Sequence, residues 1–268
     1  MPFYEVAILN MHIYTLFVVS CIVFCIPTAI ANCRCKIGVC ARLRLPPDAN
    51  TQICVRPVSQ DIHVVGSIVR SGLWEPHVAT PFYRAVLKNP SALVLDVGTH
   101  LGQYSLIAAA SGSTVVGFEA NPNNVEYLRA SLALNALTMH IINQPVSVVT
   151  GQRFIQRGGP SRNVGGWGIR PNSTGNLIST TIDDTLLKLG YFTGPIIMKI
   201  DIEGHEPQAL AGAHETLKRV ILIYMEWGNQ HATEAKIDMA RQLLQFGLTT
   251  PCAATDFKDC PWDIVWKR

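Results

Sequence analysis

The chain of 268 residues has little charge, and it lacks the marks of several classes of protein. Only 15% of the residues are charged, the formal net charge is +3, and the basic residues form no stripe with interleaved aromatics, which excludes a nucleic-acid footprint. The eight cysteines include no paired Cys-x-x-Cys, so their spacing does not fit a zinc knuckle. Without internal repeats or low-complexity tracts, this length suits one α/β domain plus appendages.

The glycine spacing of a dinucleotide site, Gly-x-Gly-x-x-Gly, is absent as well, and a related turn stands in its place. Residues 93–119 read LVLDVGTHLGQYSLIAAASGSTVVGFE. The pattern predicts a buried strand from Ala92 to Asp96, a tight turn with Gly98 and Gly102, and an apolar helix over 103–110. Glycine lets a ligand approach the backbone closely at such a helix start. The run therefore predicts a nucleotide-binding βαβ unit.

Two carboxylates of this unit bear on the choice of cofactor. Asp96, just before the first glycine, would repel a pyrophosphate, whereas it suits a cationic sulfonium that carries an ammonium. Glu119 ends a second strand, Thr114 to Phe118, roughly 20 residues after the turn, where it can accept hydrogen bonds from ribose hydroxyls. We therefore favour S-adenosylmethionine; a nicotinamide cofactor and a purely structural turn are the alternatives.

A third apolar strand, Ile196 to Asp201 (IIMKID), leads into IEGHE and a helix expected from about Pro207 to Lys218. Open α/β sheets place their ligands at the carboxyl ends of strands, and four ionisable groups gather there. Glu206 and Pro207 are explained as the start of the helix. For Asp201 and Glu203, with His205, we expect a catalytic role. The following strand, Val220 to Glu226, ends in another carboxylate.

Together these blocks carry a family resemblance. LVLDVGTHLGQYS, VVGFEANPNNVEYLRASLALN, STTIDDTL, IIMKIDIEGHEPQALAGA and ILIYMEW, in this order and spacing, resemble the FkbM family of S-adenosylmethionine-dependent methyltransferases. The similarity covers about Leu93 to Gly247 and extends to the final DIVWK. Asp-x-Gly-x-x-x-Gly combined with Lys-Ile-Asp-Ile-Glu-Gly-His-Glu is specific, and either motif alone would be weak.

The resemblance implies a class I methyltransferase (Rossmann-like) fold, with a mostly parallel seven-stranded sheet flanked by helices, and O-methylation of a hydroxyl on a sugar, glycan or small molecule. It departs from the family pattern at Thr99-His100, where Ala-Asn is common, and at Ala120, where proline is usual. Trp74-Glu75 resembles a segment that packs across the cofactor mouth. The implied cofactor-binding residues are Asp96, Gly98, Gly102, Glu119 and Asn121.

Val6 to Ala31 is nearly continuous apolar sequence, and about 20 such residues suffice to span a bilayer. We expect residues 1–31 to be an uncleaved signal anchor; a cleaved signal peptide and a peripheral helix are the alternatives. A stem rich in cysteine and proline is expected over 32–58, with Leu45 to Val58 as a linker, and the methyltransferase domain over 59–268.

Two signals disagree about the side of the membrane on which the domain lies. Arg34, Lys36, Arg42 and Arg44 follow the span and favour the cytosol. Cysteines crowd the stem, Cys252 and Cys260 lie close together, and Asn172-Ser173-Thr174 is an acceptor sequon for N-glycosylation. We interpret these features as a lumenal domain in the secretory pathway, with disulfides in the stem; inert thiols in the cytosol are the alternative.

Residues 151–177 are a glycine-rich insertion, which we expect to form a hairpin over the active-site mouth, with Trp167 as a platform for substrate or as a plain hairpin tip. Glu75 and Glu226 are further candidates for contact with substrate. A helix is expected over 121–135, and another over 182–189 with Asp183 and Asp184 in structural roles near its start.

Transfer of a methyl group to a neutral hydroxyl also requires a base. Glu203 and His205, oriented by Asp201, are the candidates; His205 suits neutral pH, whereas a carboxylate would need its pKa raised. Repulsion among Asp201, Glu203 and Glu226 could supply that rise, or a divalent cation could relieve it, and no residue is assigned as a metal ligand. The rivals to an O-methyltransferase are a membrane-anchored binding protein that lost turnover and a nicotinamide oxidoreductase.

Overall fold

The computed structural model describes residues 35–45, 51–158, 162–228, 233–252 and 260–268. Cys35–Arg268 is one compact unit. Within the described ranges no helix is long and apolar enough to cross a membrane. The apolar segment from Val6 to Ala31, for which we expect an anchor, lies outside these ranges.

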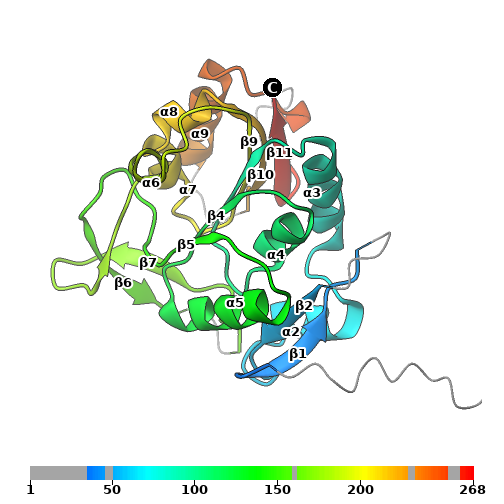
Figure 1. The fold of residues 1–268 in the computed structure, drawn as a ribbon. Helices are drawn as coiled ribbons and strands as arrows, with labels where there is room; N and C mark the ends of the chain where they lie inside the picture. The colour runs from blue at the N-terminus through cyan, green and yellow to red at the C-terminus, as the bar shows by residue number, and fades with distance from the viewer. Residues whose placement is uncertain (1–34, 46–50, 159–161, 229–232, 253–259) are drawn as a thin grey trace, which may run out of the picture. The chain divides into compact units, whose positions relative to one another are not determined.

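A six-stranded sheet forms the centre of this unit (Figure 1). All neighbours pair in parallel except the last strand, which runs antiparallel to the strand beside it. The two central strands are buried along their whole length, as expected for a parallel sheet covered on both faces. In spatial order the strands are β11 (Asp263–Lys267), β10 (Val220–Glu226), β9 (Ile196–Ile200), β3 (Leu93–Val97), β4 (Val115–Phe118) and β5 (His140–Ile142).

The seventh strand that we expected is reduced to a single bridge in the described residues. Thr249 exchanges two main-chain hydrogen bonds of 2.8 Å with Lys267 on the outer side of β11. Pro251 follows two residues later, and proline has no N–H to continue a ladder. The mostly parallel α/β architecture is confirmed, and the count of seven strands is corrected to six with one bridge.

Helices cover both faces of the sheet. Successive side chains of each strand point to opposite faces, so each face has its own hydrophobic core. Val94 and Ile197 belong to one hydrophobic core, and their neighbours Leu95 and Met198 belong to the other. The first core lies under α2 (Val64–Ser71), α3 (Pro76–Lys88), α4 (Gln103–Ala110) and α5 (Pro122–Leu134). The second lies under α6 (Ile182–Leu189), α7 (Glu206–Ala211), α8 (His214–Leu217) and α9 (Thr233–Gln245).

The segment expected to be a free stem is part of the folded unit. β1 (Val39–Arg42) and β2 (Gln52–Val55) form an antiparallel hairpin, and β2 packs on α5. The amide of Cys54 donates to the Ser131 hydroxyl at 2.8 Å, and Ile53 is fully buried. The compact unit therefore begins at Cys35 rather than at residue 59, and the linker expected over 45–58 contains β2.

Disulfides secure two places in the unit. Cys35 pairs with Cys54 on β2, and Cys252 pairs with Cys260 before β11. The first bond ties the start of the unit to the hairpin, and the second closes a short loop next to the sheet. The first bond joins two cysteines of the expected stem, and the second joins the two cysteines that lie close together near the C-terminus.

The insertion of residues 151–177 forms a small sheet of its own. β6 (Arg153–Arg157) pairs with β7 (Gly168–Pro171) on one side and β8 (Leu177–Ile178) on the other. The loop between β6 and β7 carries Trp167 toward the carboxyl ends of the central strands, where it lines a cleft. The expected hairpin at the mouth is confirmed.

Candidate active site

A cleft lies at the carboxyl ends of β3, β4, β9 and β10 and has two halves. We call the first, of about 640 Å³ and lined by the end of β4 and the start of α5, the cofactor half. We call the second, lined by the ends of β9 and β10 and by the segment before α3, the acceptor half. The residues that line both halves are Gly98, His100, Gly165, Asp201 and Glu203.

The two glycines of the turn are required by the protein's own packing. Gly98 has φ of 92°, and a Cβ there would lie 2.0 Å from the carbonyl oxygen of Asp201. At Gly102, also at 92°, a Cβ would lie 2.3 Å from Leu128 Cδ1. Gly98 lines the cleft and Gly102 does not line either half. Close approach of the chain at Asp201 and of α5 is therefore enough by itself to require glycine at these two positions.

Asp96 lies beneath the turn and is fully buried. Its Oδ2 accepts a hydrogen bond of 2.6 Å from the Ser105 hydroxyl on α4, and burial raises the pKa of Asp96 to about 6. It is not among the residues that line either half of the cleft, unlike our expectation of a direct contact with the cofactor. What the structure assigns to Asp96 is support of the turn through Ser105.

Glu119 lies in the cofactor half, where the sequence placed it, and it already binds the protein. Its Oε2 accepts from the His100 amide at 2.7 Å, and its Oε1 accepts from the Asn121 amide at 2.8 Å and from Asn124 Nδ2 at 3.3 Å. Burial raises the pKa of Glu119 to about 7. A carboxylate has about four lone-pair sites, so about one remains for a ribose hydroxyl rather than one for each of two hydroxyls.

Asn121 and Trp167 also line the cofactor half. Asn121 caps α5, because its Oδ1 accepts from the Asn123 amide at 2.9 Å. Trp167, 39% exposed, lies on the same side as Glu119 and does not line the acceptor half among the described residues. This position suits the wall of a cofactor site better than the substrate platform that we expected.

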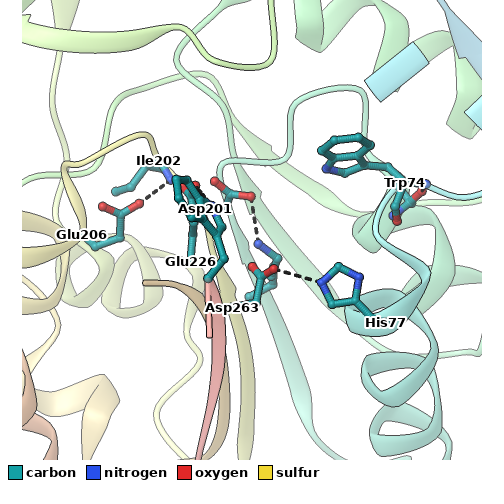
Figure 2. Close-up of polar contacts among 10 residues, drawn as sticks. Trp74, His77, Asp201, Ile202, Glu206, Glu226 and Asp263 are labelled. Atoms are coloured by element: carbon teal, nitrogen blue, oxygen red, sulfur yellow. Dashed lines mark hydrogen bonds and ion pairs between the residues drawn. The ribbon is translucent and has the colours of Figure 1, made fainter. Parts of the chain in front are cut away.

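The acceptor half gathers carboxylates from three segments that are far apart in the sequence. Asp201 and Glu203 follow β9, Glu226 ends β10, and Glu75 precedes α3. Asp201, Glu203 and Glu226 each offer an oxygen, and these atoms lie within 4.8 Å of one another. Figure 2 shows Asp201 beside Glu226 and facing the segment of Trp74. The structure thus brings together four of the residues that the sequence singled out.

Lys199 counters part of this negative charge. It is 1% exposed, its Nζ donates to Asp201 Oδ2 at 3.0 Å, and it lies 5.2 Å from the centre of the Tyr104 ring. Burial tends to raise the pKa of Asp201, but the charge and hydrogen bond of Lys199 and the contact with Glu226 bring it below its ordinary value. Asp201 is therefore an ionised carboxylate held by an ammonium.

The other three acids have raised pKa values. Burial, and then the charge of Asp201, raises the pKa of Glu226 to about 9. Burial and the charge of Asp263 raise the pKa of Glu75 to about 7. For Glu203, which is exposed at the mouth, the surrounding protein and the charge of Asp201 raise the pKa to about 7. The acceptor half is thus crowded with carboxyl groups that resist ionisation.

His205 lies outside this group. Its Nε2 is 3.2 Å from the Ser147 hydroxyl, its ring packs edge-on against Phe154 at 5.3 Å, and it is not among the residues that line either half. Glu206 supports the start of α7, because its Oε1 accepts from the Ile202 amide at 2.7 Å (Figure 2). The structural reading of Glu206 is confirmed, and the geometry leaves Glu203 as the candidate base at the cleft.

Three residues of the acceptor half were not among those that the sequence predicted. Lys199 has a visible signal, since a lysine inside the apolar run IIMKI is a buried charge that needs a partner. Tyr104 on α4 and Trp262 before β11 have none, because they reach the cleft only through the fold. Trp262 Nε1 donates to Glu226 Oε1 at 2.8 Å.

Comparison with known proteins identifies the family. The model of the family described as Methyltransferase FkbM domain matches residues 96–250. The chain belongs to this family. A curated relative, Hexuronic acid methyltransferase AglP of Haloferax volcanii, is 26% identical over 156 residues, which are 58% of this chain. The match spans 62% of the length of that relative.

Solved methyltransferase structures are similar to this chain at low identity. The 16S rRNA N2 G1207 methyltransferase RsmC of T. thermophilus, in complex with AdoMet and guanosine, is 14% identical with a TM-score of 0.44, over 87% of this chain and 50% of that chain. Magnesium protoporphyrin IX methyltransferase (ChlM) of Synechocystis PCC 6803, with bound SAM, is 12% identical with a TM-score of 0.39, over 71% and 76%. These similarities concern the fold alone.

The cofactor half fits the S-adenosylmethionine that this family uses. Phe118, Val146 and Ile169 supply apolar walls, and Glu119 supplies an acceptor beside them. In the acceptor half, next to the shared residues Gly98 and His100, the buried hydroxyl of Thr99 has no hydrogen-bond partner among the described residues, so it can bind a polar ligand group. Apolar walls, a ribose acceptor and polar groups at one end match an adenosine that carries a polar tail.

Proposed function

We propose that the protein is an S-adenosylmethionine-dependent O-methyltransferase that acts on a hydroxyl of a sugar, glycan or small molecule. The observation that carries this proposal is the position of Glu203, which lines both halves of the cleft next to Asp201. When bound, S-adenosylmethionine supplies an electrophilic methyl group; as the new O–C bond forms, the C–S bonding pair goes to sulfur and a neutral hydroxyl must release its proton.

Glu203 is our candidate to take that proton. It has φ of 56°, a left-handed conformation that a glutamate rarely adopts, and this holds the residue at the boundary of the two halves. Asp201, fixed by Lys199, lies beside it. A positioned base contributes about 10² to 10⁴ in rate, so Glu203 can account for a large part of catalysis.

A sugar acceptor is supported by the relative that methylates hexuronic acid, and by the acidic lining of the acceptor half. Carboxylates accept hydrogen bonds from hydroxyl groups, which suits a polyol. Trp74 and Trp262 line the same half and offer apolar faces to a sugar ring. An acceptor with several hydroxyls therefore fits better than an apolar one.

Transfer of labelled methyl from S-adenosylmethionine to fractionated cell glycans, lipids and small molecules tests this proposal. We expect label in a glycan or soluble polyol fraction, stable to mild base as an ether is. The Glu203→Gln variant should transfer at least about a hundredfold more slowly while it binds S-adenosylhomocysteine normally. No transfer to any fraction, with normal cofactor binding, would instead favour a binding protein that kept the fold.

We also propose that residues 1–31 anchor the protein in a membrane and that the domain lies in the lumen of the secretory pathway. The disulfides Cys35–Cys54 and Cys252–Cys260 and the acceptor sequon at Asn172 support an oxidising, glycosylating compartment. Glycosidase digestion should shift the mass of wild type and not of Asn172→Gln, and alkaline carbonate should not extract the full-length chain. Free thiols together with an unmodified Asn172 would place the domain in the cytosol.

A further inference from the structure

We propose that Asp201, Glu203 and Glu226 bind a divalent cation in the acceptor half. One carboxylate oxygen from each residue lies within 4.8 Å of the others, at the ends of the neighbouring strands β9 and β10. Carboxylate oxygens are the donors that Mg²⁺, Mn²⁺ and Ca²⁺ prefer, and these ions accept water or a ligand oxygen in their remaining positions. The cleft leaves room for such further ligands.

Buried polar groups around this cluster are an independent sign of a ligand. The Tyr104 residue is 8% exposed, lines the same half, and its hydroxyl has no hydrogen-bond partner among the described residues. Oε2 of Glu75, in the same lining, is likewise buried and without a partner there. Buried polar atoms are nearly always hydrogen-bonded. Several such atoms around one cleft therefore point to bound water or ligand groups beside the carboxylates.

The hydrogen bonds of the cluster leave the right oxygens available. Lys199 occupies Oδ2 of Asp201 and Trp262 occupies Oε1 of Glu226. Oε2 of Glu226 is buried, and the Glu226 carboxyl group shares a hydrogen bond with the Asp201 carboxylate. A cation between these two groups would take the place of the shared proton.

The balance of charge favours a divalent ion over a monovalent one. Once a bound ion has displaced their protons, the three carboxylates together with the ammonium of Lys199 carry two negative charges. A divalent cation balances them, and the ammonium stays on the far oxygen of Asp201. Glu206 does not compete for the ion through Oε1, which accepts from the Ile202 amide.

The ion would also serve the reaction, and this step rests on the proposed function. A hydroxyl bound to a divalent cation has a lowered pKa, as metal-bound water does. The ion would hold the acceptor oxygen at the boundary of the two halves, where one oxygen of Glu203 would bind the ion and its other oxygen would take the proton. The acceptor would then be a hydroxyl with a second oxygen nearby to complete the coordination, such as a sugar diol.

Terbium luminescence on the purified full-length chain tests the ion directly. Tb³⁺ seeks the same hard oxygen donors and emits when a nearby tryptophan is excited, and Trp262 binds Glu226 itself. We expect saturable emission that Mg²⁺ or Mn²⁺ displaces. Glu203→Gln, an exposed position that should fold normally, and Glu226→Gln should each weaken binding at least tenfold.

Asp238→Asn is the matched control, because Asp238 is an exposed carboxylate on α9 that pairs only with Arg241 in the described residues. It should leave the titration unchanged. Circular dichroism of every variant checks the fold.

The proposal is overturned if folded wild type shows no saturable emission, or if the Glu203 and Glu226 variants titrate like wild type. If the chain binds the ion but transfers no methyl group, only the proposed reaction is overturned. If methyl transfer persists in the presence of a chelator and no ion binds, only the cation site is overturned.

Discussion

The two halves of the cleft differ in how their charged groups are satisfied. In the cofactor half one carboxylate, Glu119, receives three hydrogen bonds from the protein. In the acceptor half four carboxyl groups face one ammonium, and several buried oxygens have no partner among the described residues. The first half is organised before any ligand arrives, whereas the second depends on a ligand to balance it.

The largest effect should follow removal of the only ammonium in the described lining of the acceptor half. Lys199→Met removes the ammonium that pairs with Asp201 and leaves this carboxylate beside other acidic groups. Breaking a buried ion pair lowers the free energy of unfolding by about 3 to 5 kcal/mol. Urea unfolding should show this loss. Lys218→Met, which breaks an exposed pair with Glu215, should change stability little. Equal effects of the two substitutions would contradict the contrast between the halves.

The cofactor half can be disrupted without the acceptor half. Glu119→Ala removes an acceptor for the ribose and the bonds that hold His100 and Asn121, so affinity for S-adenosylhomocysteine should fall ten- to a hundredfold, or about 1 to 3 kcal/mol. Calorimetry measures it. Glu126→Ala, at an exposed position of α5, is the control. Unchanged affinity in the Glu119 variant would remove the cofactor from this half.

A smaller effect concerns pH. The folded pKa of Glu119 is about 7, above its ordinary value of 4.5, so between these values the folded chain holds a proton that the unfolded chain releases. Stability should therefore fall as pH rises from about 5 to 7 and level off above. Glu119→Gln should remove its share of this slope, as urea unfolding at several pH values would show. An identical slope in wild type and variant would contradict the shift.

The sequence predicted the cofactor half because local patterns define it. Strand β3, the turn with Gly98 and Gly102, helix α4 and the strand before Glu119 follow one another within a single stretch of chain. The βαβ spacing therefore places Glu119 without knowledge of the rest of the fold. The packing role of the glycines was not visible, because the close approach of Asp201 and Leu128 is a tertiary contact.

The acceptor half could be predicted only in part. Asp201, Glu203 and Glu226 end strands that are strongly apolar, so their place at one edge was visible. Tyr104 and Trp262 come from other parts of the chain and carry no local signal. Strand β2 was read as part of a linker because prolines and polar residues surround a strand of only four residues, whose burial on α5 supplies its stability.

The central claim is that the cofactor half is a working S-adenosylmethionine site that is independent of the acceptor half. Calorimetric titration of wild type and Glu203→Gln with S-adenosylhomocysteine tests it most directly. We predict one binding site per chain and the same affinity in both proteins, since the bonds of Glu119 do not involve Glu203. The absence of binding to folded wild type would contradict the account.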